Sequence, residues 1–294
     1  MTALKNKIDF VLVFSVKNAN PNGDPLNGNI PRTTFDGYGE LSDVCLKRKI
    51  RNRLQDAGEN IFVQSDDYRK DVYPSLRSRA EAILGKAMKN ETELRELANK
   101  TWIDVRSFGQ VFAFKGDKDK DENEDKKKKK EKGVSIGIRG PVTIQPAFSI
   151  DPISVTSLQI TKSVSGEGDG TKRGSDTMGM KHSVDFGMYA TYGSINPQLA
   201  ELTGFDDADA DKIKHALLHI FDNDASSARP EGSMEVIKLF WWKHNSKSGQ
   251  YSAAKVHRTL KITKKDGVSQ AKSADDYITT TDNLPDLTPE VLSF

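Results

Sequence analysis

The sequence predicts a mixed α+β fold with an antiparallel sheet, and two observations support this. Apolar runs of strand length lie between stretches with helical hydrophobic spacing, in the order strand, helix, helix, several strands, helix and strand. This order is typical of an α+β domain with long insertions. No segment repeats at a fixed period and no boundary separates two cores, so residues 1–294 are expected to form a single domain.

The first predicted strand covers residues 8–16. Ile8, Phe10 and Leu12 alternate with Val11 and Val13, so both faces of this strand are expected to be buried. The other strands of the sheet are predicted near residues 102–114, 134–150, 183–192 and 235–242, with a further strand at 155–162. The chain after residue 256 is polar, and few strands are expected there.

Three stretches have helical periodicity. Ser42 is a suitable N-cap for a helix over residues 43–57, and Gly58 is a suitable stop. Residues 71–100 predict one or two helices, and residues 207–221 predict an acidic helix.

Composition restricts the class of protein. Hydrophobic residues make up 36% and charged residues 29% of the 294 residues, which predicts a soluble chain. No apolar run is long enough to cross a bilayer, and the first residues lack a signal-peptide pattern, so a cytoplasmic location is expected. The single cysteine, Cys45, excludes an internal disulfide and a zinc site built mainly on cysteine.

No motif points to catalysis. His215 and His219 have a spacing that can hold a metal, but no glutamate follows His215 as in zinc peptidases, and structural histidines are favoured. The glycines at 166–170 match neither the P-loop nor the dinucleotide-binding pattern. We therefore expect no cofactor, no metal and no enzymatic activity.

A polar loop follows the first strand. It carries Asn18, Asn20, Asn22 and Asp24 among prolines and glycines, residue types that favour tight turns. Such a loop at a strand end can grip a polyanion or simply turn the chain.

Basic residues are dense on the predicted helix at 43–57. Lys47, Arg48, Lys49, Arg51 and Arg53 lie within seven residues, with only Asp43 nearby, so they repel one another unless a polyanion relieves them. The alternative is a basic face exposed to solvent.

Two other segments fit nucleic-acid binding. Arg106, Ser107 and Phe108 combine a guanidinium, a hydroxyl and an aromatic ring beside Gly109, although they also fit an ordinary strand. Met178 and Met180 are adaptable apolar side chains that could enter between bases, or pack on a neighbouring domain or subunit. The basic residues that flank them are Lys162, Lys172, Arg173, Lys181 and His182.

Residues 117–132 alternate acids and then lysines without a hydrophobic residue, which predicts a flexible insert over about 116–133. A solvated loop and a lysine contact to a nucleic-acid backbone both remain open.

Taken together, these segments resemble the Cas7 family, the RAMP-superfamily backbone subunits of CRISPR Cascade complexes, and most of all its type I-C members. The resemblance runs from about residue 8 to 245. The matching segments are Asn18-Ala-Asn-Pro-Asn-Gly-Asp-Pro25, Ser42-Asp-Val-Cys-Leu-Lys-Arg-Lys49, Asp104-Val-Arg-Ser-Phe-Gly109, Gly137-Ile-Arg-Gly-Pro-Val142 and Lys172-Arg-Gly-Ser-Asp-Thr-Met-Gly-Met-Lys181.

The resemblance implies an RRM-like (ferredoxin-like) palm with inserted fingers or web and a thumb at residues 163–181. It also implies a helical filament of several copies along the guide RNA (crRNA), which presents the guide for pairing with a target DNA strand. Partners would be other copies of the chain, the five-type and eight-type Cascade subunits and a small subunit.

The resemblance also assigns RNA-binding residues. They are Asn18, Asn20, Asn22, Lys47, Arg48, Arg51, Arg106, Ser107, Phe108, Arg139, Lys162, Lys172, Arg173, Met178, Met180, Lys181 and His182. The alternative is a RAMP-type endoribonuclease that cuts guide-paired RNA with a loop aspartate, for which Asp24 and Asp36 are the candidates. A third hypothesis is a DNA-binding structural protein without a guide.

Overall fold

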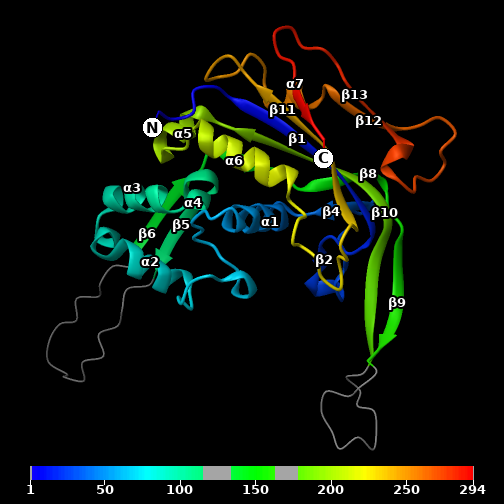
Figure 1. Cartoon of the computed structure of the whole chain (residues 1–294), viewed down its shortest axis with the longest axis horizontal. Helices are drawn as coiled ribbons and strands as arrows, with labels where there is room; N and C mark the ends of the chain where they lie inside the picture. Colours follow the sequence, from blue (N-terminus) through cyan, green and yellow to red (C-terminus); the bar gives the residue numbers. More distant parts are fainter. Residues whose placement is uncertain (1, 115–133, 163–177, 294) are drawn as a thin grey trace, which may run out of the picture.

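The computed structural model describes residues 2–114, 134–162 and 178–293 of the chain. Its main sheet has the strand order β14-β11-β1-β10-β8-β4, and β7 and β9 also pair with β10. Figure 1 shows this sheet along the top of the molecule, with α1 beneath it. The strands of the main sheet are β1 (Ile8–Ala19), β4 (Tyr38–Leu41), β7 (Val142–Ile144), β8 (Ala147–Pro152), β9 (Val155–Thr161), β10 (Met178–Ile195), β11 (Met234–Lys243) and β14 (Glu290–Leu292). The mixed α+β class with an antiparallel sheet is therefore confirmed.

The remaining elements lie around this sheet. The other strands form three two-stranded pairs: β2 (Gly23–Asp24) with β3 (Ile30–Pro31), β5 (Gly109–Phe114) with β6 (Val134–Arg139), and β12 (Leu260–Lys264) with β13 (Tyr277–Thr281). The α-helices are α1 (Asp43–Asp56), α2 (Leu76–Leu84), α3 (Glu91–Thr101), α4 (Ile103–Phe108), α5 (Pro197–Thr203), α6 (Asp207–Leu218) and α7 (Ala253–His257). Short 3-10 turns are η1 (Pro25–Asn27), η2 (Asp66–Tyr68), η3 (Gly85–Lys89) and η5 (Ala274–Asp276).

Strand β1 is the centre of the fold, and both of its faces are buried as predicted. It pairs with β10 from Ile8↔Ile195 to Ala19↔Val184, and with β11 on its other side. Phe10 and Leu12 belong to the core beneath α1 and α6, whereas Val11 and Val13 belong to a second core under the C-terminal residues. The alternating strand therefore supplies side chains to two hydrophobic layers.

The C-terminal residues contain more strand than the sequence suggested. The hairpin β12–β13 covers the second core with Leu260 and Tyr277, and β14 pairs with β11 at the edge of the main sheet. The expectation of few strands after residue 256 was wrong because these strands have at most five residues, too few for a clear periodic signal.

The predicted helices are largely confirmed. The Oγ of Ser42 accepts a hydrogen bond from the Cys45 backbone N–H at 3.2 Å and caps α1, which ends two residues before Gly58. Residues 71–100 contain α2, η3 and most of α3, and residues 207–218 form α6.

Residues 102–108 are a difference from the prediction. Trp102 is the C-cap of α3 and residues 103–108 form α4 instead of a strand, and Gly109 with φ of +80° ends this helix where β5 begins. The alternation of Ile103 and Val105 fits a strand, but Asp104 is also fully buried and accepts two backbone hydrogen bonds, which the helical turn makes possible.

Strands β5 and β6 also depart from the prediction. They form a separate sheet that packs with α2 and α3 around Phe62, Trp102 and Phe112, so the predicted sheet segments 102–114 and 134–139 lie outside the main sheet. Only β7 and β8, from the second half of the predicted 134–150 segment, join it. We call α2, α3, α4, β5 and β6 the helical module.

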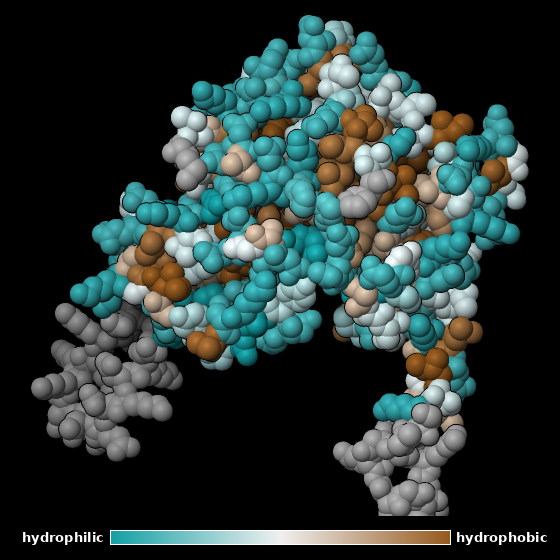
Figure 2. All heavy atoms as spheres, in the orientation of Figure 1, coloured by the Kyte–Doolittle hydropathy of each residue, from teal (hydrophilic) through white to brown (hydrophobic). Residues whose placement is uncertain are grey.

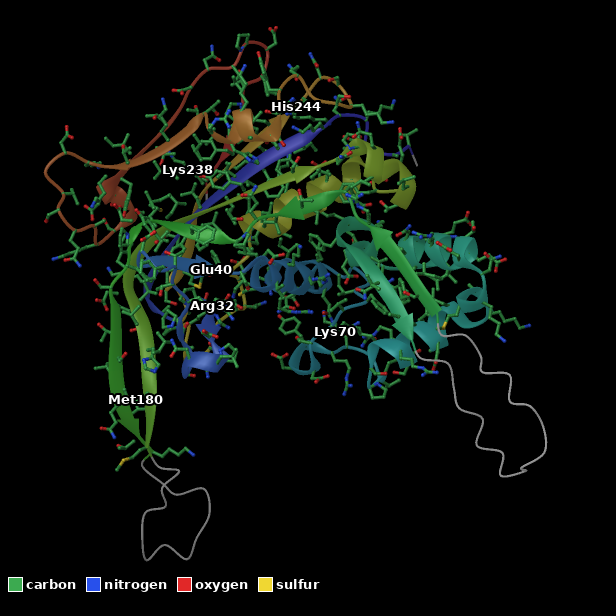
Figure 3. All side chains as sticks on the ribbon, turned by 180° about the vertical axis from the view of Figure 1, so that it is seen from behind. Arg32, Glu40, Lys70, Met180, Lys238 and His244 are labelled. Atoms are coloured by element: carbon green, nitrogen blue, oxygen red, sulfur yellow. The ribbon has the colours of Figure 1, made fainter. Side chains whose placement is uncertain are left out.

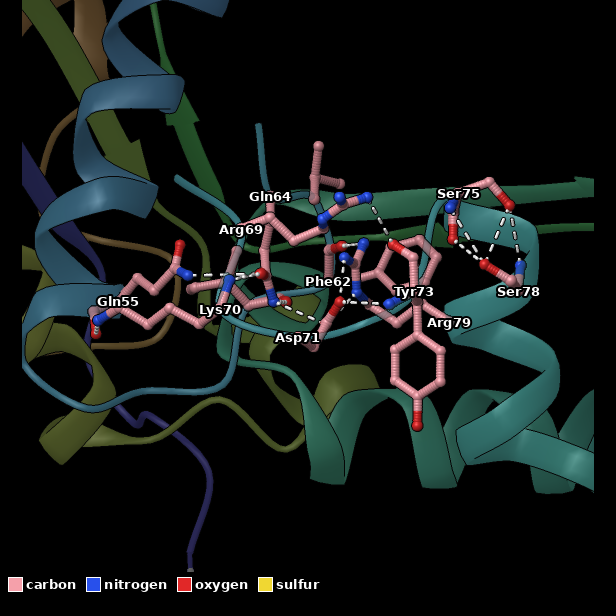
Figure 4. A network of polar contacts seen from close by, with 12 residues as sticks. Gln55, Phe62, Gln64, Arg69, Lys70, Asp71, Tyr73, Ser75, Ser78 and Arg79 are labelled. Carbon is pink, nitrogen blue, oxygen red and sulfur yellow. Dashed lines mark hydrogen bonds and ion pairs between the residues drawn. The ribbon is translucent and has the colours of Figure 1, made fainter. Parts of the chain in front are cut away.

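A polar network holds the entry to the helical module. The guanidinium of Arg79 donates to both oxygens of Asp71 at 2.6 and 2.8 Å and to the Phe62 carbonyl at 2.8 Å (Figure 4). The bond from Arg79 holds the pKa of the Asp71 carboxyl below its usual value. Arg79 is only 3% exposed, so this paired charge fixes the 62–79 segment.

Strands β9 and β10 extend away from the main sheet as a two-stranded arm, residues 155–161 and 178–184, opposite to the helical module (Figure 1). The strand predicted at 155–162 is β9. Met178 and Met180 lie on β10. Residues 163–177 of the predicted thumb, which include Lys172 and Arg173, lie outside the described residues. Residues 115–133 of the predicted insert also lie outside them.

A glycine on β10 tests how tightly the central strand is packed. A methyl group at Gly193 would overlap the ring of Phe10, which is fully buried and stacks on Trp241. We expect Gly193→Ala to lower the free energy of unfolding by about 1–3 kcal/mol, as overpacking does. Urea denaturation measures this. Gly137→Ala is the matched control, because no atom lies within 4 Å of its added methyl group; equal stability of both variants would contradict the packing described.

Candidate nucleic-acid-binding surface

The basic residues of α1 are paired inside the protein. Arg51 donates from Nε to Asp104 at 2.9 Å, and Lys49 and Arg53 pair with Asp224 and Asp56. The mutual repulsion inferred from the sequence is therefore relieved by carboxylates of the chain, so it does not require a polyanion. The sequence could not show this, because Asp104 and Asp224 are far from α1 along the chain.

Lys49 is the most buried of these cations. Its side chain is 5% exposed, and burial lowers the pKa of its ammonium although Asp224 opposes the shift. Arg229 also contacts Asp224, at 2.9 Å, which ties the 221–233 loop to α1. The buried Lys49 therefore links α1 to the loop that carries Asp224.

Lys47, Arg48 and Arg51 keep part of their surface open. The Lys47 ammonium lies 3.0 Å from Asp43, with both side chains about one-third exposed or less. Arg48 donates to the Val63 carbonyl at 2.8 Å, and burial lowers the pKa of its guanidinium. Arg51 stacks over the ring of Phe108 at 5.1 Å. Together these residues form one half-open side of α1.

The asparagine loop is attached to the start of α1. Asn22 accepts hydrogen bonds through Oδ1 from the backbone N–H and the hydroxyl of Ser42, both at 3.0 Å. The Asn20 amide donates to the Asn29 carbonyl at 2.6 Å, and its side chain is buried. Asn18 is exposed and has φ of +52°, a conformation that asparagine tolerates. Of the three asparagines, Asn18 presents its side chain to solvent and the other two shape the loop.

The candidate aspartates of the nuclease alternative lie in this region. Asp24 accepts from the Leu26 backbone N–H at 3.2 Å and lies 3.6 Å from Arg32, while Asp36 is exposed in the turn before β4. Within the described residues, no group of three or more histidine, cysteine, aspartate or glutamate side chains is placed to hold a metal ion.

The 106–108 segment is mostly internal. Arg106 makes two hydrogen bonds to Asp209, at 2.7 and 2.8 Å. Burial alone would lower the pKa of its guanidinium, but Asp209 outweighs this and the pKa is raised. Ser107 is fully buried, and Phe108 packs against the main core. Only Arg139 of this group, on β6, has an exposed side chain.

The arm carries the remaining predicted residues. Met178 and Met180 are 65% and 56% exposed and share one face of the arm with His182, whose Nδ1 lies 2.7 Å from the Ser157 hydroxyl. The opposite face presents Leu158 and Ile160, two exposed aliphatic residues that sequence reasoning missed despite the strand alternation. Lys162 and Lys181 are exposed as well.

Figure 2 shows apolar side chains gathered near the end of the arm, and Figure 3 shows Met180 there from behind.

The arm, the asparagine loop and α1 lie next to one another on one side of the molecule. Val184 pairs with Ala19, so the root of the arm adjoins the asparagine loop, which in turn adjoins the start of α1. The Arg51–Phe108 contact joins α1 to the helical module. Figure 2 shows the surface hollowed between the arm and the helical module, with mostly hydrophilic side chains there. We call this hollow the α1 surface: α1, the asparagine loop and the arm face with Met178 and Met180.

His215, His219 and Cys45 have local partners or are shielded from solvent. The ring of His215 on α6 stacks at 4.2 Å on that of His219, the C-cap residue of α6, and His219 pairs with Asp222 at 2.8 Å. Cys45 is partly buried, and burial raises the pKa of its thiol, which disfavours the reactive thiolate. Within residues 2–114, 134–162 and 178–293, no helix is long and apolar enough to cross a membrane.

Comparison with known proteins assigns the chain to a family. The family model described as CRISPR-associated protein Cas7 matches residues 6–282. The CRISPR-associated protein Cas7 of Haloferax volcanii is 28% identical over 235 residues, which are 77% of this chain and 67% of that protein. The chain belongs to the Cas7 family of CRISPR-associated proteins.

Two chains from solved structures also match. One, from a CRISPR RNA-guided surveillance complex in a pre-nicking state, has a TM-score of 0.47 at 14% identity and covers 80% of this chain and 78% of its own. The other, from a CRISPR RNA-guided surveillance complex, has a TM-score of 0.44 at 16% identity and covers 90% of this chain and 78% of its own.

The Arg51–Asp104 pair gives a stability prediction. Arg51→Ala leaves the fully buried carboxylate of Asp104 without a counter-charge, which should cost about 3–5 kcal/mol of unfolding free energy. Lys47→Ala breaks a more exposed pair and should cost less than about 1 kcal/mol. Denaturant unfolding measures both. Adding Asp104→Asn to Arg51→Ala should recover part of the loss; no recovery would mean that the buried charge is not its cause.

Proposed function

We propose that this chain is a crRNA-binding backbone subunit of a type I Cascade surveillance complex, of subtype I-C, and that it acts without catalysis. Membership of the Cas7 family over residues 6–282 carries the proposal, and the α1 surface supports it. The main sheet would be the RRM-like palm, the helical module the fingers, and the arm the thumb. Copies of the chain would assemble along the guide in the cytoplasm with five-type, eight-type and small subunits.

The charged and polar groups of the α1 surface suit contact with the phosphate backbone of an RNA and not recognition of its bases. Its open groups are the amide of Asn18 and the ammonium group of Lys47, and we propose that the guanidinium of Arg139 and the ammonium group of Lys181, on the opposite face of the arm, extend it. These groups lie on four elements, β1, α1, β6 and β10, and each can take one phosphate. Sequence would then be read by pairing of the guide with a target DNA strand.

Met178 and Met180 would act beside this backbone contact. They are half to two-thirds exposed on a projecting strand, and a flexible thioether side chain can enter between bases and displace one from the stack. Arg48, Arg51 and the buried part of the 106–108 segment would shape the groove from within. Lys162, Lys172, Arg173 and His182 are proposed to lie beside the methionines.

Co-purification tests the proposed function. We expect the chain, expressed with its partner subunits and a repeat array, to purify in a high-mass particle with guide RNA of uniform length. Size-exclusion chromatography and sequencing of the bound nucleic acid measure this. A monomer free of nucleic acid at low salt would overturn the proposal. Cleavage of guide-paired RNA that needs a divalent metal and is lost in Asp24→Ala or Asp36→Ala would favour the endoribonuclease alternative.

The open cations give a sharper prediction. We expect the triple variant Lys47→Ala, Arg139→Ala and Lys181→Ala to weaken RNA binding equally for all sequences. The slope of log K against log salt should fall by about 2, since each single-strand phosphate contact contributes about 0.7. Fluorescence anisotropy with two unrelated RNA sequences measures both quantities. The matched control is Lys5→Ala, Lys86→Ala and Lys89→Ala, three exposed lysines on other elements; equal losses in the two triple variants would contradict the assigned surface.

A further inference from the structure

A second cleft lies on the other face of the main sheet, at the root of the arm. Its volume is about 460 Å³, and it lies between the end of β8, the middle of β10 and the segment that links β12 to β13. Lys17 and Phe186, which are paired across β1 and β10, contribute to its wall. Phe186 packs with the second core, beneath the C-terminal hairpin, so this cleft is separate from the α1 surface.

The cleft has an excess of positive charge. The carboxylate of Asp151 is engaged by the Tyr277 hydroxyl at 2.8 Å and by Lys264 at 3.3 Å, and Asp185 accepts from the Thr156 hydroxyl at 2.6 Å. Among the described residues, by contrast, no carboxylate lies within ion-pair distance of the ammonium group of Lys17 or Lys272. The lining therefore has three lysines and two aspartates, an excess of one positive charge, which favours an anionic ligand near Lys17 and Lys272.

The walls of the cleft favour a ligand with a flat apolar part. Phe186 is only partly buried, and Ile153, Pro152 and Ala271 extend the apolar wall beside it. Because Lys17 and Phe186 are directly opposite on neighbouring strands, a cation and an aromatic ring lie side by side on one face. Single-stranded nucleic acids are bound by this combination, in which bases stack on rings and phosphates contact lysines.

We propose that this cleft binds one nucleotide unit of a single-stranded nucleic acid, with its phosphate on Lys17 and Lys272 and its base against Phe186. A volume of 460 Å³ is within the range of about 300–1,000 Å³ that is common for ligand sites. The site is distinct from the surface proposed for the guide, so the chain would contact nucleic acid on both faces of its sheet. The assignment stands on the geometry of this cleft and does not require the proposed function.

Anisotropy titrations with a labelled 12-nucleotide single strand test the proposal. The Lys17→Ala, Lys272→Ala double variant should bind more weakly, and its salt slope should fall by about 1.4 for two lost phosphate contacts. Phe186→Leu keeps apolar volume in the wall but removes the ring, so it should weaken binding several-fold without changing the salt slope. Lys5→Ala, Lys86→Ala is the control with the same loss of charge, and its slope should be unchanged.

The same titrations separate this site from the α1 surface. The double variant should cause the same loss of affinity and slope in the wild-type background and in the background of Lys47→Ala, Arg139→Ala and Lys181→Ala. An unchanged salt slope in both backgrounds would overturn the cleft site while leaving the guide surface intact. Competition with inorganic phosphate or a free mononucleotide distinguishes the ligands. If either one displaces the strand only from chains that keep Lys17 and Lys272, and binds as tightly as the strand does, the cleft is a small-anion site. The proposal of a single-strand site is then wrong.

Discussion

The pairing of Arg51 with Asp104 is the interaction on which the helical side of the molecule depends. The carboxylate is fully buried, yet it accepts hydrogen bonds from the backbone N–H groups of Phe62 and Val63, at 2.8 and 3.0 Å, as well as the Arg51 guanidinium. A buried charge is tolerated only when such partners are all present. One side chain of α4 therefore fixes the 61–63 segment and the middle of α1 relative to one another, and Phe108 stacks against the same arginine.

This internal pairing changes how the basic helix contributes to the surface. Lys49, Arg51 and Arg53 pair with carboxylates of the chain, so much of the positive charge of α1 is compensated inside the protein. Exposed cations are instead spread over the helix, β6 and the arm. Contacts that are separate and individually weak suit a surface that follows a phosphate backbone, because each one adds affinity without selecting a base.

Sequence reasoning reached the parts of the fold with strong local signals. Strand β1 has nine residues of unbroken alternation and α1 has a good N-cap, so both were predicted nearly to their ends. Residues 103–108 were not, because a six-residue segment with Ile103 and Val105 fits a strand as well as a helix, and a tertiary contact of Asp104 decides between them. For the candidate site, the location of Lys47 and Met180 on exposed elements followed from the pattern. The partners of Arg51 and Arg106 did not, since Asp104 and Asp209 come from segments whose approach no local pattern encodes.

The length of β10 has a mechanical consequence. Its 18 residues run without interruption from the centre of the main sheet into the arm, a span of about 60 Å at the usual rise of a strand. Residues 178–183 of β10 pair with β9 alone, whereas the strand from Val184 onward pairs with β1 and, further along, with β8 and β7. The arm is therefore attached at one end only, to the core of the protein. A force applied at its free end is resisted by the hydrogen bonds between β1 and β10. The register of this strand pairing sets the direction of the arm. The position of the arm is therefore fixed by the sheet before a partner binds.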